Sequence, residues 1–120
     1  MKRQTKTTQK QDVERNGSQR IERNYSKDNK KCRIAFWLPK DFAPGAQSIA
    51  VAGSFNGWDP CSHPLKKLEN GDFSLTVEVA AGKEYQIRFV VDDARWENAG
   101  NADKYVWSEY AGCENSVIVT

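Results

Sequence analysis

The stretch NGDFSLTVEVAAGKEYQIRFVVDD, residues 70–93, decides the fold class. Apolar side chains recur at every second position over residues 73–79 and again over residues 85–91. A period of two is typical of β-strands with one buried face, whereas an amphipathic helix has a period near 3.6. Turn residues, NGD at 70–72 and AGK at 81–83, precede the two runs. We therefore predict two antiparallel strands entered through tight turns.

Shorter runs of the same kind lie on both sides of this stretch. CRIAFWL, residues 32–38, alternates in the same way, and strands are also predicted near 48–53, within 65–69 and over 115–120. The segment between Glu97 and Glu114 is polar and reads as a long connection. Six or seven short antiparallel strands in about 90 residues predict an all-β, immunoglobulin-like antiparallel β-sandwich.

The distribution of charge divides the chain into two parts. Residues 1–31 hold ten basic and four acidic side chains, a net charge of +6, whereas residues 32–120 hold eight basic and twelve acidic ones, a net charge of −4. The first part has few sizeable apolar side chains, too few to offset the entropy of ordering it. We predict a disordered basic tail over 1–31 and one sandwich domain over 32–120.

Several function classes are excluded by size and composition. The 120 residues are too few for a catalytic (β/α)₈ barrel, which needs roughly 250. The sequence shows no secretory signal and no apolar run long enough to cross a bilayer. The odd count of three cysteines suits a reducing compartment. We therefore expect a cytoplasmic protein without membrane contact. The lone His63 near Cys61 does not make a zinc site, and no metal or cofactor is predicted.

Catalysis is also not expected. The chain has one histidine, no Gly-x-Ser-x-Gly turn and no phosphate-binding loop of the Gly-Lys-Ser/Thr kind. The neighbours Asp92 and Asp93 are more typical of a turn than of a glycosidase pair, whose carboxylates must reach a scissile bond from opposite sides. We predict a binding protein rather than an enzyme.

Aromatic residues in predicted turns and loops carry the functional signal. Trp58 lies in the turn SFNGWDP (residues 54–60), Trp96 follows the Asp92-Asp93 turn, and Trp107 and Tyr110 lie in the polar segment before the last strand. An exposed indole can stack on the apolar face of a pyranose ring, while amide and guanidinium groups hydrogen-bond to the hydroxyls. A nucleic-acid platform would need surrounding basic residues, but this domain is net acidic, so nucleic acid is not an expected partner.

These residues give the chain a family resemblance. Three stretches carry the resemblance: VAGSFNGWDP, the stretch from LKKLENGDF to VVDD with the following Trp96, and the ending ENSV at 114–117. With them the chain resembles the glycogen- and starch-binding modules of family 48, also called the isoamylase N-terminal early set domain. This domain is also found in the β-subunits of AMP-activated and SNF1-type kinases. The resemblance covers residues 32–120. It implies an immunoglobulin-like β-sandwich that binds α-1,4-glucans without catalysis.

The resemblance also implies a set of site residues. Trp58 and Trp96 match the stacking tryptophans, Arg88 the basic strand residue and Asn115 the asparagine that binds sugar hydroxyls; Asn56, Trp107 and Tyr110 are additional candidates. The expected partner is an α-glucan polysaccharide or a maltooligosaccharide. The alternative is an early set protein-interaction domain that has lost sugar binding and contacts another protein through its basic tail, an edge strand or the aromatic residues near Trp107.

Overall fold

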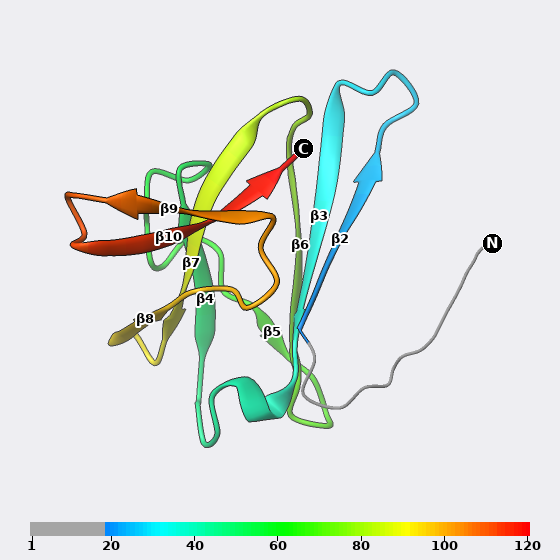
Figure 1. Cartoon of the computed structure of the whole chain (residues 1–120). Helices are drawn as coiled ribbons and strands as arrows, with labels where there is room; N and C mark the ends of the chain where they lie inside the picture. The colour runs from blue at the N-terminus through cyan, green and yellow to red at the C-terminus, as the bar shows by residue number, and fades with distance from the viewer. Residues whose placement is uncertain (1–18) are drawn as a thin grey trace.

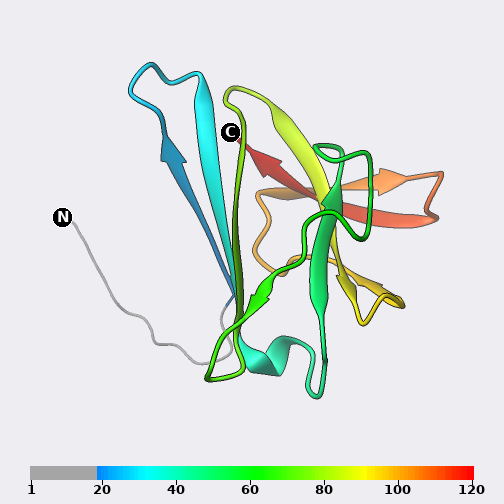
Figure 2. The same ribbon diagram turned by 180° about the vertical axis from the view of Figure 1, so that it is seen from behind.

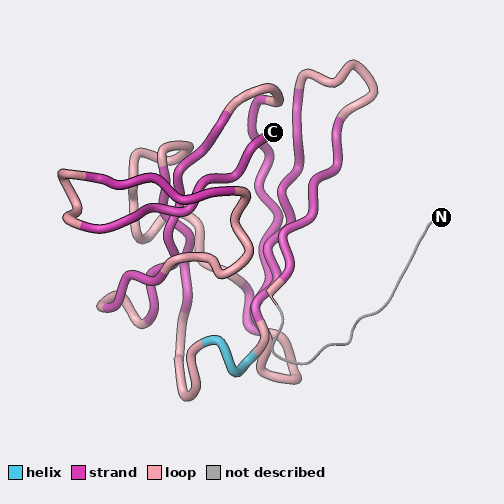
Figure 3. Tube along the Cα trace, viewed as in Figure 1, coloured by secondary structure: helices cyan, strands magenta, loops and turns pink. Residues whose placement is uncertain are grey.

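The computed structural model describes residues 19–120, which are built almost entirely of β-strands (Figure 1, Figure 3). The strands are β2 (Arg20–Tyr25), β3 (Lys31–Leu38), β4 (Ile49–Gly53), β5 (Lys66–Lys67), β6 (Phe73–Ala80), β7 (Glu84–Val91), β8 (Arg95–Glu97), β9 (Lys104–Ser108) and β10 (Cys113–Val119). Within this part of the chain the one helical element is a short 3-10 turn, η1 (Lys40–Phe42). The all-β prediction is confirmed.

The strands form two antiparallel sheets that face each other (Figure 2). One sheet has the order β4-β7-β10-β9, and β8 pairs with the end of β7. The other has the order β2-β3-β6-β5. The hairpin of β9 and β10 projects away from β2 and β3, so it extends beyond the cover of the opposite sheet (Figure 1). This arrangement is an immunoglobulin-like β-sandwich, as the sequence predicts.

The core lies between the sheets and is made by the inward half of each alternating run. Phe36 from β3 and Phe89 from β7 meet edge to face at the centre, with ring centroids 5.8 Å apart. Burying a side chain of this kind contributes about 1.5–3 kcal/mol to folding. Inward packing of Ile87 and Phe89 directs Arg88 to the outer face of the sheet, because neighbouring side chains on a strand point to opposite faces.

The predicted boundary between tail and domain is wrong. Residues 20–25, assigned to the disordered tail, form β2, and each of them has a partner on β3. The charge pattern misled the prediction because the polar side chains of β2 have partners: Arg23 donates to the carbonyl of Val119 (2.9 Å) and pairs with Asp103, and the Tyr25 hydroxyl donates to the carbonyl of Thr120 (2.8 Å). The rest of the predicted tail, residues 1–18, lies outside the described residues.

The polar segment between Glu97 and Glu114 is also more ordered than predicted, because it contains β9. This strand pairs with β10, and its Tyr105 lies opposite Ser116. It is an edge strand with no fully buried side chain, so the alternation of apolar residues that reveals a strand is missing from its sequence. The remaining predicted strands are present, with ends that differ by a few residues.

Candidate functional site

A depression with a volume of about 700 Å³ lies on the outer face of the sheet that contains β7. Residues from the β4–β5 loop, β7, β8 and the β9–β10 hairpin line it: Gly57, Trp58, Gln86, Arg88, Trp96, Ser108, Tyr110, Ala111 and Asn115. The fold thus brings together Trp58, Arg88, Trp96 and Asn115, the residues predicted as the main ligand contacts. Neither indole belongs to the buried core.

Trp58 is presented by an unusually tight turn. Gly57 (φ 68°) and Trp58 (φ 62°) both have left-handed backbone conformations. For a bulky residue this conformation costs of order 1–3 kcal/mol and persists only where the surroundings enforce it. The Trp58 N–H donates to the carbonyl of Gly53 (2.8 Å), which closes the turn and leaves the indole half-buried at the depression.

Asn56 organises this turn and does not line the depression. Its Oδ1 accepts from the N–H of Gly53 (2.9 Å), and its Nδ2 faces the carbonyl of Val51 (3.2 Å) and Nδ1 of His63 (3.1 Å). The side chain therefore joins the end of β4 to the far end of the loop. Asn56, predicted as an additional ligand contact, is not among the lining residues, and its hydrogen bonds hold the turn that carries Trp58.

Trp96 is carried by the hairpin of β7 and β8. The turn places Asp92 (φ 53°) and Asp93 (φ 56°) in the left-handed region, which aspartate tolerates better than most residues. The N–H of Ala94 donates to the carbonyl of Val91 (3.0 Å), and Trp96 then lies opposite Val90 on β7. Its side chain is 37% exposed, so the hairpin holds an indole in contact with solvent.

Asp92 secures this hairpin to the body of the sandwich. Its carboxylate accepts from the backbone N–H groups of Ser48 (2.9 Å) and Gln47 (2.8 Å), and these hydrogen bonds hold the pKa of Asp92 below its usual value. A carboxylate stabilised in its ionised form is not suited to protonate a leaving group. The predicted turn role of the two aspartates is confirmed.

Arg88 and Asn115 form the polar part of the depression. Nη2 of Arg88 donates to the carbonyl of Trp96 (3.0 Å), and Nδ2 of Asn115 donates to Oε1 of Gln86 (3.0 Å). Among residues 19–120, Nε of Arg88 and Oδ1 of Asn115 are buried without a hydrogen-bond partner. An unpaired buried polar atom costs about 1–3 kcal/mol, which favours a shift of these side chains that exposes the donor and the acceptor to a ligand. A hydroxyl group supplies both functions.

The β9–β10 hairpin supplies the rim. Its turn is closed by a hydrogen bond from the N–H of Gly112 to the carbonyl of Ser108 (2.8 Å), and Tyr110 stands fully exposed beside the depression. Trp107 does not line the depression, although it is 64% exposed. Asn115 pairs with Val106 on β9, so the alternation of the strand places Trp107 on the opposite face.

Two polar lining residues, Gln86 and Ser108, are absent from the sequence-based candidates, as are the small Gly57 and Ala111. Gln86 precedes Arg88 by two positions on β7 and therefore shares its outward face, a signal available in the alternation of residues 84–91. Ser108 ends β9, the strand that the sequence does not reveal, and no comparable signal marks it.

The lining of the depression combines aromatic side chains with amide, hydroxyl and guanidinium groups. Its lining residues include no carboxylate, histidine or cysteine, whereas glycoside hydrolysis generally uses two carboxyl groups. In the described part of the chain no three His, Cys, Asp or Glu side chains are grouped as they would be around a metal ion. No helix among residues 19–120 has the length and apolarity to cross a membrane.

Fold and depression together define a small domain of the β-sandwich class with an aromatic depression on one face. Comparison with known families agrees: the model of carbohydrate-binding module 48 (isoamylase N-terminal domain) matches residues 21–111. The chain belongs to this family, and the family resemblance drawn from the sequence is confirmed.

Similar curated proteins carry the same kind of sequence within much longer chains. A 1,4-alpha-glucan branching enzyme GlgB 2 from Xanthomonas campestris pv. campestris is 38% identical over 64 residues, which is 52% of this chain and 8% of the enzyme. Protein PTST homolog 2, chloroplastic, from Arabidopsis thaliana is 42% identical over 52 residues, 43% of this chain and 9% of that protein. The horse 1,4-alpha-glucan-branching enzyme is 45% identical over 38 residues, 32% of this chain and 5% of the enzyme. The chain therefore spans less than a tenth of these relatives.

Proposed function

We propose that this domain binds α-1,4-glucan, either as glycogen or starch or as a maltooligosaccharide, in the depression between Trp58 and Trp96. The two indoles stack against the apolar faces of sugar rings. Arg88 and Asn115 hydrogen-bond to the hydroxyls, and Tyr110 extends the contact at the rim. The domain contributes binding only and uses neither metal nor cofactor.

One observation carries the proposal: two accessible indoles share a depression with an unpaired buried donor, Nε of Arg88, and an unpaired buried acceptor, Oδ1 of Asn115. A sugar ring offers an apolar C–H face and hydroxyls that donate and accept, so it complements both features. The family match supports a carbohydrate ligand. The relatives named as 1,4-alpha-glucan branching enzymes support the choice of an α-1,4-linked glucan.

Binding to a short oligosaccharide is expected to be weak. An open site of this kind gives a Kd on the order of 10⁻³ to 10⁻⁵ M, or about −4 to −7 kcal/mol. A polymer presents many overlapping sites, and retention on glycogen is strengthened when more than one module is engaged. A cytoplasmic location remains a prediction.

Electrophoresis through a gel that contains glycogen tests the proposal. Wild-type protein should migrate more slowly than in a glycogen-free gel, and Trp58→Ala and Trp96→Ala should each lose most of this retardation. Titration with maltoheptaose should also change the tryptophan fluorescence of the wild type, since indoles contact the sugar.

Trp107→Ala is the matched control. Trp107 belongs to the same sheet as Trp96 and is more exposed, but its indole lies outside the depression. This variant should be retarded like the wild type. Circular dichroism checks that all three variants keep the fold. Retention by folded Trp58→Ala and Trp96→Ala at the wild-type level would refute the proposal.

A further inference from the structure

Strand β6 has an open edge for most of its length. On one side all eight of its residues pair with β3. On the other side β5 pairs only with Phe73 and Ser74, because the chain before β5 crosses to the other sheet, where Leu65 donates to the carbonyl of Ile49 (2.8 Å). Among residues 19–120 no strand pairs with residues 75–80 on this side.

The direction of the backbone groups on β6 follows from two hydrogen bonds. The N–H of Ala81 donates to the carbonyl of Lys30 (2.9 Å), so odd-numbered positions of this strand direct their N–H and C=O groups toward β3. The carbonyl of Asp72 accepts from Leu68 (2.7 Å), so even-numbered positions face the side of β5. Thr76 and Glu78, both exposed, therefore present their N–H and C=O groups at the open edge.

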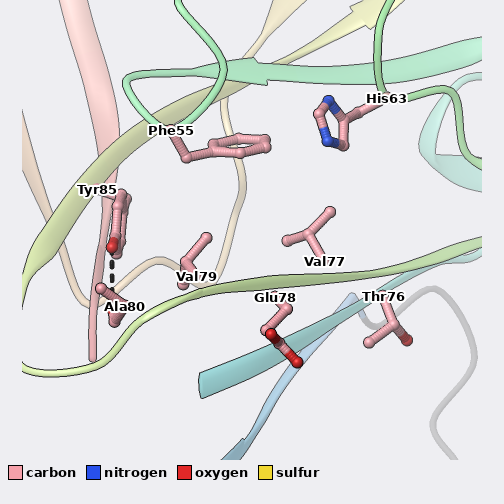
Figure 4. A pocket seen from close by; sticks show the side chains of 8 residues that line it. All are labelled: Phe55, His63, Thr76, Val77, Glu78, Val79, Ala80 and Tyr85. Atoms are coloured by element: carbon pink, nitrogen blue, oxygen red, sulfur yellow. Dashed lines mark hydrogen bonds between the residues drawn. The ribbon is translucent and has the colours of Figure 1, made fainter. Parts of the chain in front are cut away.

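A slot of about 440 Å³ runs along this edge (Figure 4). Val77 and Val79 point into it from β6, and Phe55 and His63 lie across from them on the β4–β5 loop. The two rings of that loop meet edge to face, with centroids 5.0 Å apart. One end of the slot is closed by Tyr85, whose hydroxyl donates to the carbonyl of Ala80 (2.9 Å).

This geometry fits an extended peptide better than a compact ligand. A strand added beside β6 would exchange backbone hydrogen bonds with Thr76 and Glu78 and direct the side chain opposite Val77 into the slot. The side chains next to that one in the added strand would point to solvent. The edge therefore selects a segment with alternating apolar and polar residues.

The charges near the edge indicate the ends of that segment. Lys31, opposite Ala80 on β3, and Arg33 share the single carboxylate of Glu78, each at 3.5 Å, so one positive charge is in excess there. At the other end the exposed Lys66 occupies the position opposite Ser74, where an added antiparallel strand would stop. Acidic residues at both ends of the segment complement these charges.

We propose that the open edge of β6 binds an extended segment of a partner protein by strand addition, with apolar residues at alternate positions and an acidic residue at each end. The surface belongs to the opposite sheet from the depression between Trp58 and Trp96. The slot shares the β4–β5 loop with Trp58, but the strand edge itself lies outside the depression, and the proposal does not rest on the proposed function.

Amide hydrogen exchange of the ¹⁵N-labelled chain, followed by NMR, tests the proposal with the blocked peptide Glu-Val-Thr-Val-Thr-Val-Glu. In the free protein the amides of Thr76 and Glu78 should exchange fast, whereas that of Val77 is protected by β3. With peptide at about ten times its Kd, exchange at Thr76 and Glu78 should slow by roughly tenfold. Chemical shifts should change at these residues and at Phe55, His63 and Tyr85.

Two controls distinguish strand addition from non-specific contact through the apolar side chains of the peptide. The peptide Glu-Val-Pro-Val-Pro-Val-Glu keeps the valines but lacks the N–H groups that would pair with β6, and it should have no effect. Thr76→Pro should abolish the response to the first peptide, whereas Thr76→Ala should keep it; both variants should still be retarded by glycogen.

Three outcomes would overturn the proposal. In the first, the alternating peptide does not slow exchange at Thr76 and Glu78; in the second, the proline peptide acts equally well. In the third, the free protein already protects these amides in a concentration-dependent manner with a matching dimer in sedimentation, which would assign the edge to a second copy of the chain.

Discussion

The outer faces of the two sheets both carry tryptophan and arginine, but these side chains have partners on one face and are partly unpaired on the other. On the four-stranded sheet Trp37 is covered by Arg20, whose guanidinium carbon lies 4.4 Å from the ring centroid, and Arg33 pairs with Glu78 (3.5 Å). On the five-stranded sheet the corresponding groups are left open: Trp96 is 37% exposed, and Nε of Arg88 has no partner among the described residues.

We expect this difference between a surface that is only structural and one that binds a ligand, as proposed for the depression. A tryptophan and an arginine that satisfy each other have little to offer a ligand. A tryptophan beside an arginine with an unpaired buried donor keeps both interactions available. Residue types alone do not make the distinction, since both faces hold tryptophan and arginine; the state of pairing does. Matched substitutions on the two faces test it.

The largest expected effect is on the stability of the turn that carries Trp58. Asn56→Ala should lower the free energy of unfolding by about 2–3 kcal/mol, because it leaves the N–H of Gly53 and the carbonyl of Val51 without their partner. Asn24→Ala, at an exposed position on β2, should change it by less than about 0.5 kcal/mol. Urea unfolding followed by circular dichroism measures both. Equal stability of the two variants would show that the turn does not depend on Asn56.

The next effect is on affinity. Arg88→Gln should weaken maltoheptaose binding by about tenfold, or about 1.4 kcal/mol, since it removes the charged donor of the depression and its hydrogen bond to Trp96. Arg33→Gln should leave affinity unchanged, because the Arg33–Glu78 pair lies on the other sheet. Isothermal titration with the oligosaccharide measures both. A similar loss in the two variants would remove the contrast between the faces.

A smaller effect is expected from the covered tryptophan. Arg20→Ala should cost about 0.5–1 kcal/mol of stability through the lost cation–π contact with Trp37. It should not alter retardation in a glycogen gel. Denaturation midpoints and gel mobility check the two statements together. A gain of glycogen retention in Arg20→Ala would mean that uncovering an indole is enough to make a sugar surface, contrary to the proposed role of Arg88 and Asn115.

Much of the fold follows from local alternation, as residues 73–79 and 85–91 illustrate. Their period of two predicts the strands, and the outward position of Arg88 follows from the burial of Ile87 and Phe89. The edge strands β2 and β9 escape prediction because little of their surface is buried and their polar side chains find partners far away in sequence, such as Arg23 with Asp103. Those partners become visible only when the sheets are assembled.

Part of the candidate site also follows from local sequence signals, and the rest depends on pairing between distant strands. The turn at Trp58 and the hairpin before Trp96 have local signals, Gly57 in the first and two aspartates in the second. Long-range pairing brings the residues of the depression together: β10 places Ser116 opposite Ile87, which brings Asn115 to the side of Arg88. The hydrogen bonds of Asn56 and the position of Trp107 on the face away from the depression depend on the assembled turn and on the register of β9, which residue types do not encode.

The smallest effect is on the dependence of stability on pH, and it compares one carboxylate from each sheet. Asp92 accepts from the N–H groups of Ser48 and Gln47, and Asp28 accepts from the Ser26 hydroxyl (2.6 Å) and the N–H of Lys30 (3.0 Å), so the pKa of each is lowered. A lowered pKa adds stability that is present above the unfolded-state pKa of about 3.9 and is lost as the pH falls through the folded-state pKa.

Urea unfolding at several pH values between about pH 6 and pH 3 measures this loss. In both Asp92→Asn and Asp28→Asn the free energy of unfolding should fall less steeply with decreasing pH than in the wild type. Because Asp92 secures the hairpin of Trp96, only Asp92→Asn should also change the tryptophan fluorescence of the free protein. A wild-type acid slope in Asp92→Asn would show that its hydrogen bonds to residues 47 and 48 do not hold the hairpin.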